Sequence, residues 1–194
     1  MRVITTLYLS MLLLTLYLGA APQDSMTVDI DLLNPIRKGF YTAVDNEDTT
    51  VSLMKFIKDN FSSNHKDYPP VILAYYATLE GLLGRHASNP FSKYAYVSRA
   101  IEKINHAVET DPDLLEGRFL RFSFFHQIPG IFGMGGKVPE DLRRTIEMLE
   151  KRDYSFADRQ MQQDMVKYLL GTDRLDAGQR KRLEKLASAF NGEQ

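Results

Sequence analysis

The sequence contains no cysteine and no tryptophan among its 194 residues. Without cysteine the chain can form no disulfide, no thiolate zinc site and no iron–sulfur cluster, and it has no cysteine nucleophile. An excess of one charge sign is also lacking, because 24 Lys and Arg residues stand against 25 Asp and Glu residues. Phosphate binding needs an excess of positive charge, so we expect no nucleic-acid partner.

One long apolar run is present, from Val3 to Leu18, and it follows the positively charged Arg2. Small residues come directly after it, and this order is typical of a secretory signal. We therefore expect residues 1–21 to be a signal peptide and the protein to be periplasmic or secreted. Because Pro22 would follow the cut, an uncleaved anchor formed by residues 3–21 remains the alternative. We expect no other membrane-spanning segment.

The remainder of the chain indicates a short acidic linker over residues 22–31 and one helical-hairpin domain over residues 32–194. Apolar residues recur there at intervals of three and four, which is the period of an α-helix. No segment shows the strict alternation of a β-strand. The pattern predicts an all-α fold with about seven to eight helices, and residues 114–127, apolar on two faces, predict a central helix.

Helix starts are marked by capping residues. The pairs Asn34–Pro35 and Asn89–Pro90 both predict a first turn, since asparagine caps free amides and proline suits the first helical position. Asp176 with Gln179 resembles a capping box. Glu140 and Asp141 open another helix, at the end where the helix dipole favours acidic side chains.

One segment carries a repeat signature. Ala100, Ile104, Ala107 and Pro112 have the spacing of the second helix of a tetratricopeptide repeat and its turn. The chain resembles this family over about one half-repeat, although the first-helix pattern is missing. Residues 116–123 also resemble a stretch of small uncharacterised exported bacterial proteins. The resemblance implies antiparallel hairpins stacked in an array that binds a protein or peptide.

A glycine-rich segment runs from Pro129 to Lys137. It departs from the phosphate-binding P-loop, because Val138 replaces the required Ser or Thr and no strand precedes it. One interpretation is a tight turn in which glycine supplies a positive φ. The other is a lid or partner-contact surface formed by the apolar residues Ile131, Phe132 and Met134.

Two arginines, Arg118 and Arg121, lie on the helix predicted to be central, and buried cations need partners. A structural ion pair with Glu80 or Glu116 is one explanation. An anionic-ligand site in a tyrosine-lined groove is the other. The candidate partner- or ligand-binding residues are therefore Tyr75, Tyr76, Arg118, Arg121, Ile131, Phe132 and Met134.

The four histidines form neither a His-x3-His pair nor an HExxH motif, and no nucleophile motif is present. We therefore expect no catalytic residues, no metal and no cofactor, and we expect that the protein is not an enzyme. The expected function is protein or peptide binding, or scaffolding. The alternative is a small-molecule-binding accessory protein of an envelope transport system.

Overall fold

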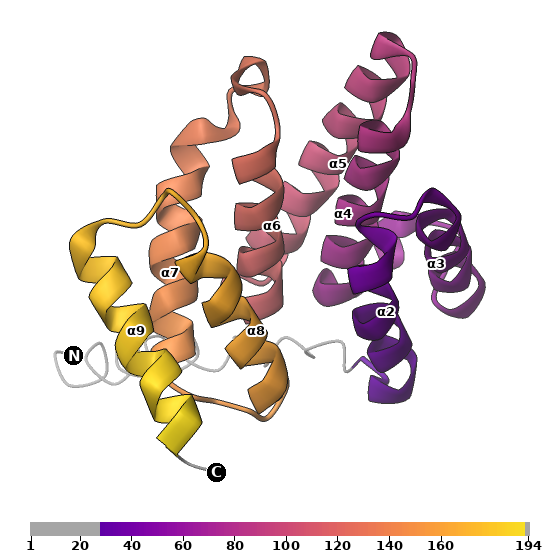
Figure 1. The fold of residues 1–194 in the computed structure, drawn as a ribbon. Helices are drawn as coiled ribbons and strands as arrows, with labels where there is room; N and C mark the ends of the chain where they lie inside the picture. The colour runs from indigo at the N-terminus through magenta and orange to yellow at the C-terminus, as the bar shows by residue number, and fades with distance from the viewer. Residues whose placement is uncertain (1–27, 193–194) are drawn as a thin grey trace, which may run out of the picture.

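The computed structural model describes residues 28–192, and within that range all regular secondary structure is helical. The predicted signal peptide lies outside these residues. The described α-helices are α2 (Ile30–Ala43), α3 (Glu47–Asn60), α4 (Pro70–His86), α5 (Pro90–Thr110), α6 (Leu115–Gln127), α7 (Val138–Glu150), α8 (Arg159–Leu170) and α9 (Ala177–Gly192). The predicted all-α fold is confirmed (Figure 1). None of the described helices combines the length and apolar character that crossing a membrane requires.

Two of the predicted capping sites are observed. The Asn89 side chain accepts a hydrogen bond of 2.8 Å from the backbone N–H of Phe91, and α5 begins between them at Pro90. Before α9, the backbone N–H of Gln179 donates to the Asp176 carboxylate at 2.7 Å. The Gln179 side chain accepts from the Asp176 N–H in return, at 3.0 Å. This exchange is the capping box that the sequence predicts.

The predicted helix start at Asn34–Pro35 is wrong. Helix α2 already begins at Ile30, because the Asp29 carboxylate caps it by accepting a hydrogen bond of 2.9 Å from the Asp31 N–H. Pro35 therefore lies inside the helix. The Asn34 side chain accepts a hydrogen bond from an arginine of the same helix instead of capping a first turn.

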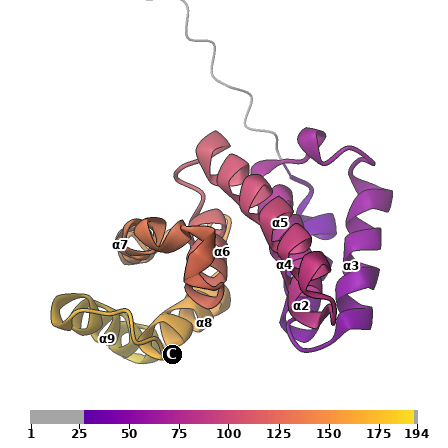
Figure 2. The same ribbon diagram turned by 90° about the horizontal axis from the view of Figure 1, so that it is seen from above.

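Helices that follow one another along the chain pack together, α2 with α3, α4 with α5, α6 with α7 and α8 with α9. The contact between α4 and α5 is the most extensive, and a turn of only residues 87–89 joins the two as antiparallel neighbours. Seen from above, α2 to α5 form one group and α6 to α9 form the other (Figure 2). Contacts of α6 with α4 and α5 connect the two groups.

The core is centred on α4, which packs against α2, α3, α5 and α6. Every residue of α4 from 71 to 81 is buried. A Cβ atom on Gly81 would lie 2.5 Å from Cε2 of Phe124, so the absence of a side chain allows α6 to approach α4 closely. The repeat-like residues Ala100, Ile104 and Ala107 are all fully buried on α5. Helix α6 is buried along most of its length, as its two apolar faces predict.

Candidate binding groove

Four of the sequence-predicted site residues lie in the interior. Tyr75, Tyr76, Arg118 and Arg121 are all buried, and they belong to α4 and α6. Their side chains therefore do not line an open groove in this structure. The two arginines and Tyr75 have partners within the protein, so the ion-pair interpretation of Arg118 and Arg121 is the one that the contacts favour.

The partner of both arginines is Asp141 of α7, and not Glu80 or Glu116 as the sequence suggests. Arg121 donates to both carboxylate oxygens of Asp141 through Nε and Nη2, each at 2.7 Å. Arg118 adds a bond of 3.0 Å from Nη1 to Oδ1. Because Asp141 is fully buried, these charge-assisted bonds hold α7 against α6 in a region without water.

A second buried cluster surrounds Glu116 of α6. Its carboxylate accepts a hydrogen bond of 2.6 Å from the Tyr75 hydroxyl and two further bonds from the Arg37 guanidinium. Burial, together with the negative charge of Glu116, raises the pKa of Tyr75 well above its ordinary value. The cluster ties α2, α4 and α6 together and is enclosed by the core, so its arrangement is structural.

An open groove lies between α2 and α8, at the C-terminal end of α6. Tyr41 of α2 and Tyr168 of α8 line it with exposed fractions of 59% and 37%. Asp164 and Lys167 place charges of both signs beside the tyrosines, and the groove has a volume of about 880 Å³. The remaining lining residues are His126, Gln127 and residues 171–173.

A ring contact partly fixes Tyr168, and the surroundings of Tyr41 change its pKa. The Tyr168 ring meets the Phe119 ring edge-on, with 5.4 Å between the ring centroids. Burial and the nearby negative charge of Asp164 raise the pKa of Tyr41. The Tyr41 hydroxyl therefore stays protonated near neutral pH and can donate a hydrogen bond. Aromatic surfaces that are already ordered lose little entropy when a partner binds.

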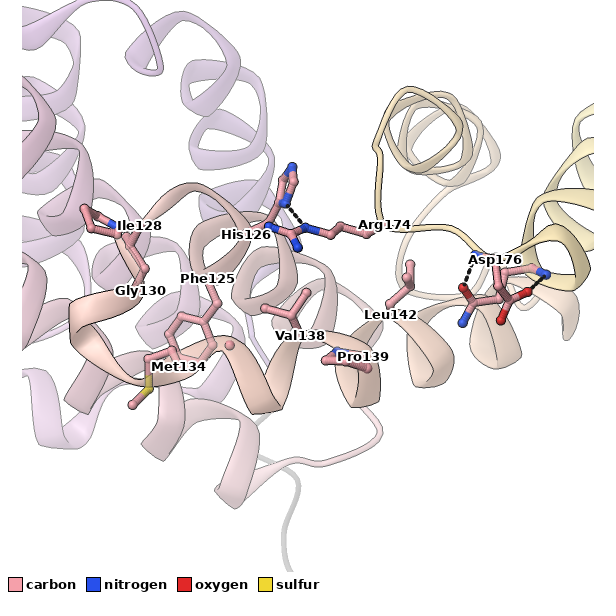
Figure 3. Close-up of a pocket in the computed structure, with 13 residues that line it drawn as sticks. Phe125, His126, Ile128, Gly130, Met134, Val138, Pro139, Leu142, Arg174 and Asp176 are labelled. Carbon is pink, nitrogen blue, oxygen red and sulfur yellow. Dashed lines mark hydrogen bonds between the residues drawn. The ribbon is translucent and has the colours of Figure 1, made fainter.

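A smaller pocket opens beside the groove, between the end of α6, the glycine-rich segment and α7 (Figure 3). Its volume is about 360 Å³. Apolar side chains of Phe125, Ile128, Met134, Val138 and Leu142 line it, and His126, Arg174, Asp176 and Gln179 add polar groups. Of the sequence-predicted loop residues, Met134 is the one that belongs to this pocket.

His126 lines both the groove and the pocket, so the two hollows are neighbours. Its Nδ1 accepts a hydrogen bond of 3.0 Å from Nε of Arg174 (Figure 3). The pair therefore joins α6 to the segment before α9 and forms a polar boundary between the hollows.

The three predicted loop residues, Ile131, Phe132 and Met134, lie in three different environments. Met134 lines the pocket, whereas Phe132 stacks on Tyr94 of α5 with 5.3 Å between the ring centroids. Ile131 is exposed to 82%. Gly133 has a φ of +71°, so the positive φ expected of a glycine in this turn is observed.

The histidines do not gather into a metal site. His86 ends α4, His106 lies near the opposite end of α5, and His126 lies on α6. Across the part of the chain that the structure describes, no three His, Asp or Glu side chains are placed so that they could hold a metal ion.

Comparisons with known proteins give no match. No family model matches the chain, and neither curated proteins nor solved structures contain a significant relative. The groove, with its tyrosines and the adjoining apolar pocket, is the candidate binding site of the described residues.

Proposed function

We propose that this protein binds a protein or peptide segment in the groove between α2 and α8, as an exported binding or scaffolding module. The observation that carries the proposal is the pair of exposed tyrosines, Tyr41 and Tyr168, in one open hollow. Tyrosine is enriched at protein interfaces because its ring contributes apolar area and its hydroxyl a hydrogen bond.

The charges of the groove suit a polypeptide better than a uniformly charged ligand. Asp164 and Lys167 lie on the same helix as Tyr168 and present opposite signs to the same hollow. A peptide offers N–H and C=O groups along its length, which both charged and neutral polar side chains can bind. A groove lined by Asp164, Lys167 and the two tyrosines supplies both kinds of side chain.

The neighbouring pocket extends this surface. An extended segment in the groove would pass His126 and could place one apolar side chain among Phe125, Met134 and Leu142. An aliphatic or aromatic anchor that fills a preformed apolar pocket contributes a large share of binding energy at many interfaces. We infer that the partner carries an apolar residue next to a stretch that contacts the tyrosines.

We also propose that the helices form a tetratricopeptide-like array and that the protein is exported. The paired packing of consecutive helices supports a tetratricopeptide-like array, whose stacked hairpins present a continuous binding surface. Export rests on the signal-like segment, residues 1–21, which lies outside the described residues. A periplasmic or secreted protein of this kind would meet its partner beyond the cytoplasmic membrane, either free or anchored through residues 3–21.

Site-specific photocrosslinking in the cells that produce the protein tests the proposal. A photoreactive phenylalanine analogue replaces Tyr41 in one variant and Tyr168 in a second. A third variant carries it at Val51 of α3, which is 52% exposed and lies outside the groove. We expect the same discrete protein adduct from the two groove positions and none from position 51. Adducts from all three positions, or from position 51 alone, would contradict the groove as the binding site.

The small pocket supports a second candidate function, small-molecule binding. A volume of about 360 Å³ with an apolar lining and a few polar groups falls within the range of ligand sites. Native mass spectrometry of the protein purified from its own host tests this function. A bound small molecule that is lost when Leu142→Trp fills the pocket would favour the second candidate over the first.

A further inference from the structure

Two of the most exposed apolar residues, Phe91 and Ile131, lie at one end of the molecule and do not line the groove. Phe91 at the start of α5 is exposed to 86% and Ile131 to 82%. The stacked rings of Tyr94 and Phe132 connect their two segments. We call Phe91, Tyr94, Ile131 and Phe132 the apolar tip. The turn before α5 and the segment between α6 and α7 both project at the top of Figure 1.

The backbone fixes the exposure of these side chains. Asn89 caps α5 and sets the direction of the first turn, on whose outer side Phe91 lies. Gly133, with its φ of +71°, closes the short helical turn that carries Ile131. A Cβ atom on Gly130, Gly135 or Gly136 would meet no neighbour within 4 Å, so the segment beside Ile131 is thin and open. Nothing in the core accounts for the position of Phe91 or Ile131.

The charge around the apolar tip is of one sign, although the whole chain is nearly neutral. Residues 81–101 and 122–139 contain no Asp or Glu, whereas they contain Arg85, Lys93, Arg99 and Lys137. Of these, Arg99 is paired with Glu80 at 2.6 Å. Lys93 is exposed and forms no ion pair with another described residue. Lys137 lies toward the other end of α5, 4.0 Å from Glu109 and donating to Asn105, so Lys93 is the cation that supplies charge at the apolar tip.

The nearest acidic turn does not reverse this sign. Asp45, Glu47 and Asp48 lie at the turn between α2 and α3, which Figure 1 shows below the turn between α4 and α5. Asp45 is paired with Arg85 at 3.3 Å. The apolar tip therefore extends beyond the acidic residues and has Lys93 beside it.

We propose that the apolar tip inserts into the interface of a bilayer that contains anionic lipid. Phe and Ile side chains gain free energy when they leave water for the acyl boundary, and tyrosine rings favour the depth of the headgroups. Lysines next to such residues are attracted to anionic headgroups and extend toward them. The tip combines these three features on two thin projections.

A protein partner fits the apolar tip less well. Stable protein interfaces bury on the order of 1,000 Å² or more, whereas two narrow projections offer four large side chains. A second copy bound to the apolar tip through a twofold contact would place both copies of Lys93 in one interface, with no acidic residue of segments 81–101 and 122–139 to offset their charge. The lipid surface needs neither a large area nor a complementary shape.

The absence of tryptophan makes a direct test possible. Phe91→Trp in the full chain introduces a single fluorophore at the apolar tip, and Val51→Trp introduces one at an exposed site on α3. Both variants are mixed with vesicles of equimolar phosphatidylcholine and phosphatidylglycerol. We expect the emission of position 91 to shift to shorter wavelength and to be quenched by lipids brominated in the acyl chains. We expect no such change at position 51.

The apolar segment 3–18 is present in both variants, so attachment through that segment alone would leave position 91 in water. An unchanged emission at position 91 in vesicle-bound protein therefore overturns the proposal. Equal shifts at both positions overturn it as well, because they would show that no particular end of the molecule enters the lipid.

Two further substitutions in the Phe91→Trp variant then measure the contributions of charge and of apolar contact separately. We expect Lys93→Gln to raise the lipid concentration that gives half of the emission shift by about fivefold. We expect Ile131→Ser to raise it by about tenfold or more. Neutral phosphatidylcholine vesicles should reduce the shift in the same way as Lys93→Gln. If instead the protein without lipid forms dimers that Ile131→Ser abolishes, the apolar tip is an interface between copies and the lipid proposal fails.

Discussion

The interior of this protein and its apolar tip reverse the usual distribution of residues. Arg118, Arg121 and Asp141 are charged and buried, whereas Phe91 and Ile131 are apolar and exposed. The buried charges are satisfied by one another across α6 and α7. The exposed apolar side chains have no comparable partner within the core. The first arrangement holds the fold together, and the second is available for contact with something outside it.

This difference separates residues that stabilise the fold from residues that are available for contact with another molecule. A buried ion pair constrains how two helices lie against each other, because each charge must reach its partner without water. An exposed Phe or Ile contributes little to folding, since it stays in water in both states. The arginines that the sequence presents as ligand candidates therefore hold α6 and α7 together, whereas Ile131 of the loop is exposed at the surface.

Asp141→Ala provides the strongest test of this contrast. The substitution leaves the buried Arg121 without a counter-charge and leaves Arg118 with only the half-exposed Glu140, so we expect the free energy of unfolding to fall by about 3–5 kcal/mol. Glu140→Ala is the control, because Glu140 also contacts Arg118 but is half exposed, and its loss should cost below about 1 kcal/mol. Denaturant unfolding followed by circular dichroism measures both. Equal losses would show that the buried position of Asp141 is unimportant.

Gly81→Ala tests the same contrast through packing. The added methyl group would collide with the Phe124 ring between α4 and α6, and we expect a loss of about 1–3 kcal/mol in the free energy of unfolding. Gly136→Ala, in the open segment near the apolar tip, should change it by less than about 1 kcal/mol and in the stabilising direction. A comparable loss at Gly136 would mean that the segment is packed against another part of the chain.

The helices were predictable from local patterns, but their mutual rotation was not. Asn89–Pro90 starts a helix because nothing upstream caps it earlier. The same pair at Asn34–Pro35 does not, because Asp29 already supplies a cap. Asp141 shows more clearly what local patterns do not predict. Its position in the first turn of α7 is predictable, yet its burial against α6 depends on how two helices meet.

The groove tyrosines were missed for a related reason. Tyr41 follows the core residue Phe40 and lies on the outward side of α2, and Tyr168 lies between buried residues of α8. Each helix alone shows only an aromatic side chain on a polar face. Their common hollow arises because α2 and α8 face each other across a long stretch of sequence, and no periodicity within one helix contains that information.

Tyr75 of the buried cluster makes the free energy of unfolding depend on pH. Its pKa is raised by burial and by Glu116, so its protonated form stabilises the folded state. This stabilisation is fully present below about pH 10, the pKa of unfolded tyrosine, and is lost as the pH rises toward the higher folded pKa. Tyr75→Phe removes one hydrogen bond to a charged group, at a cost of about 1.5–3 kcal/mol near neutral pH. We expect the difference from the original protein to shrink above pH 10.

Unfolding free energies of both proteins, measured from pH 7 to 11, check this expectation. Lysine deprotonation affects the two proteins equally and cancels in the difference. Tyr68, whose pKa burial raises to about 12, is also shared by both and does not disturb the comparison. A difference that stays constant above pH 10 would show that the Tyr75 hydroxyl titrates as it does in the unfolded chain.

Phe91→Ala should have the smallest effect and is the one that isolates the apolar tip. Because Phe91 is 86% exposed, removing its ring leaves no cavity, and we expect the free energy of unfolding to change by no more than about 0.5 kcal/mol. Thermal and denaturant unfolding of the chain without lipid measure this change. A loss above about 1 kcal/mol would mean that the ring is packed against another part of the same chain, and the apolar tip would then belong to the fold. An unchanged stability leaves the ring free to contribute its apolar area to an external surface.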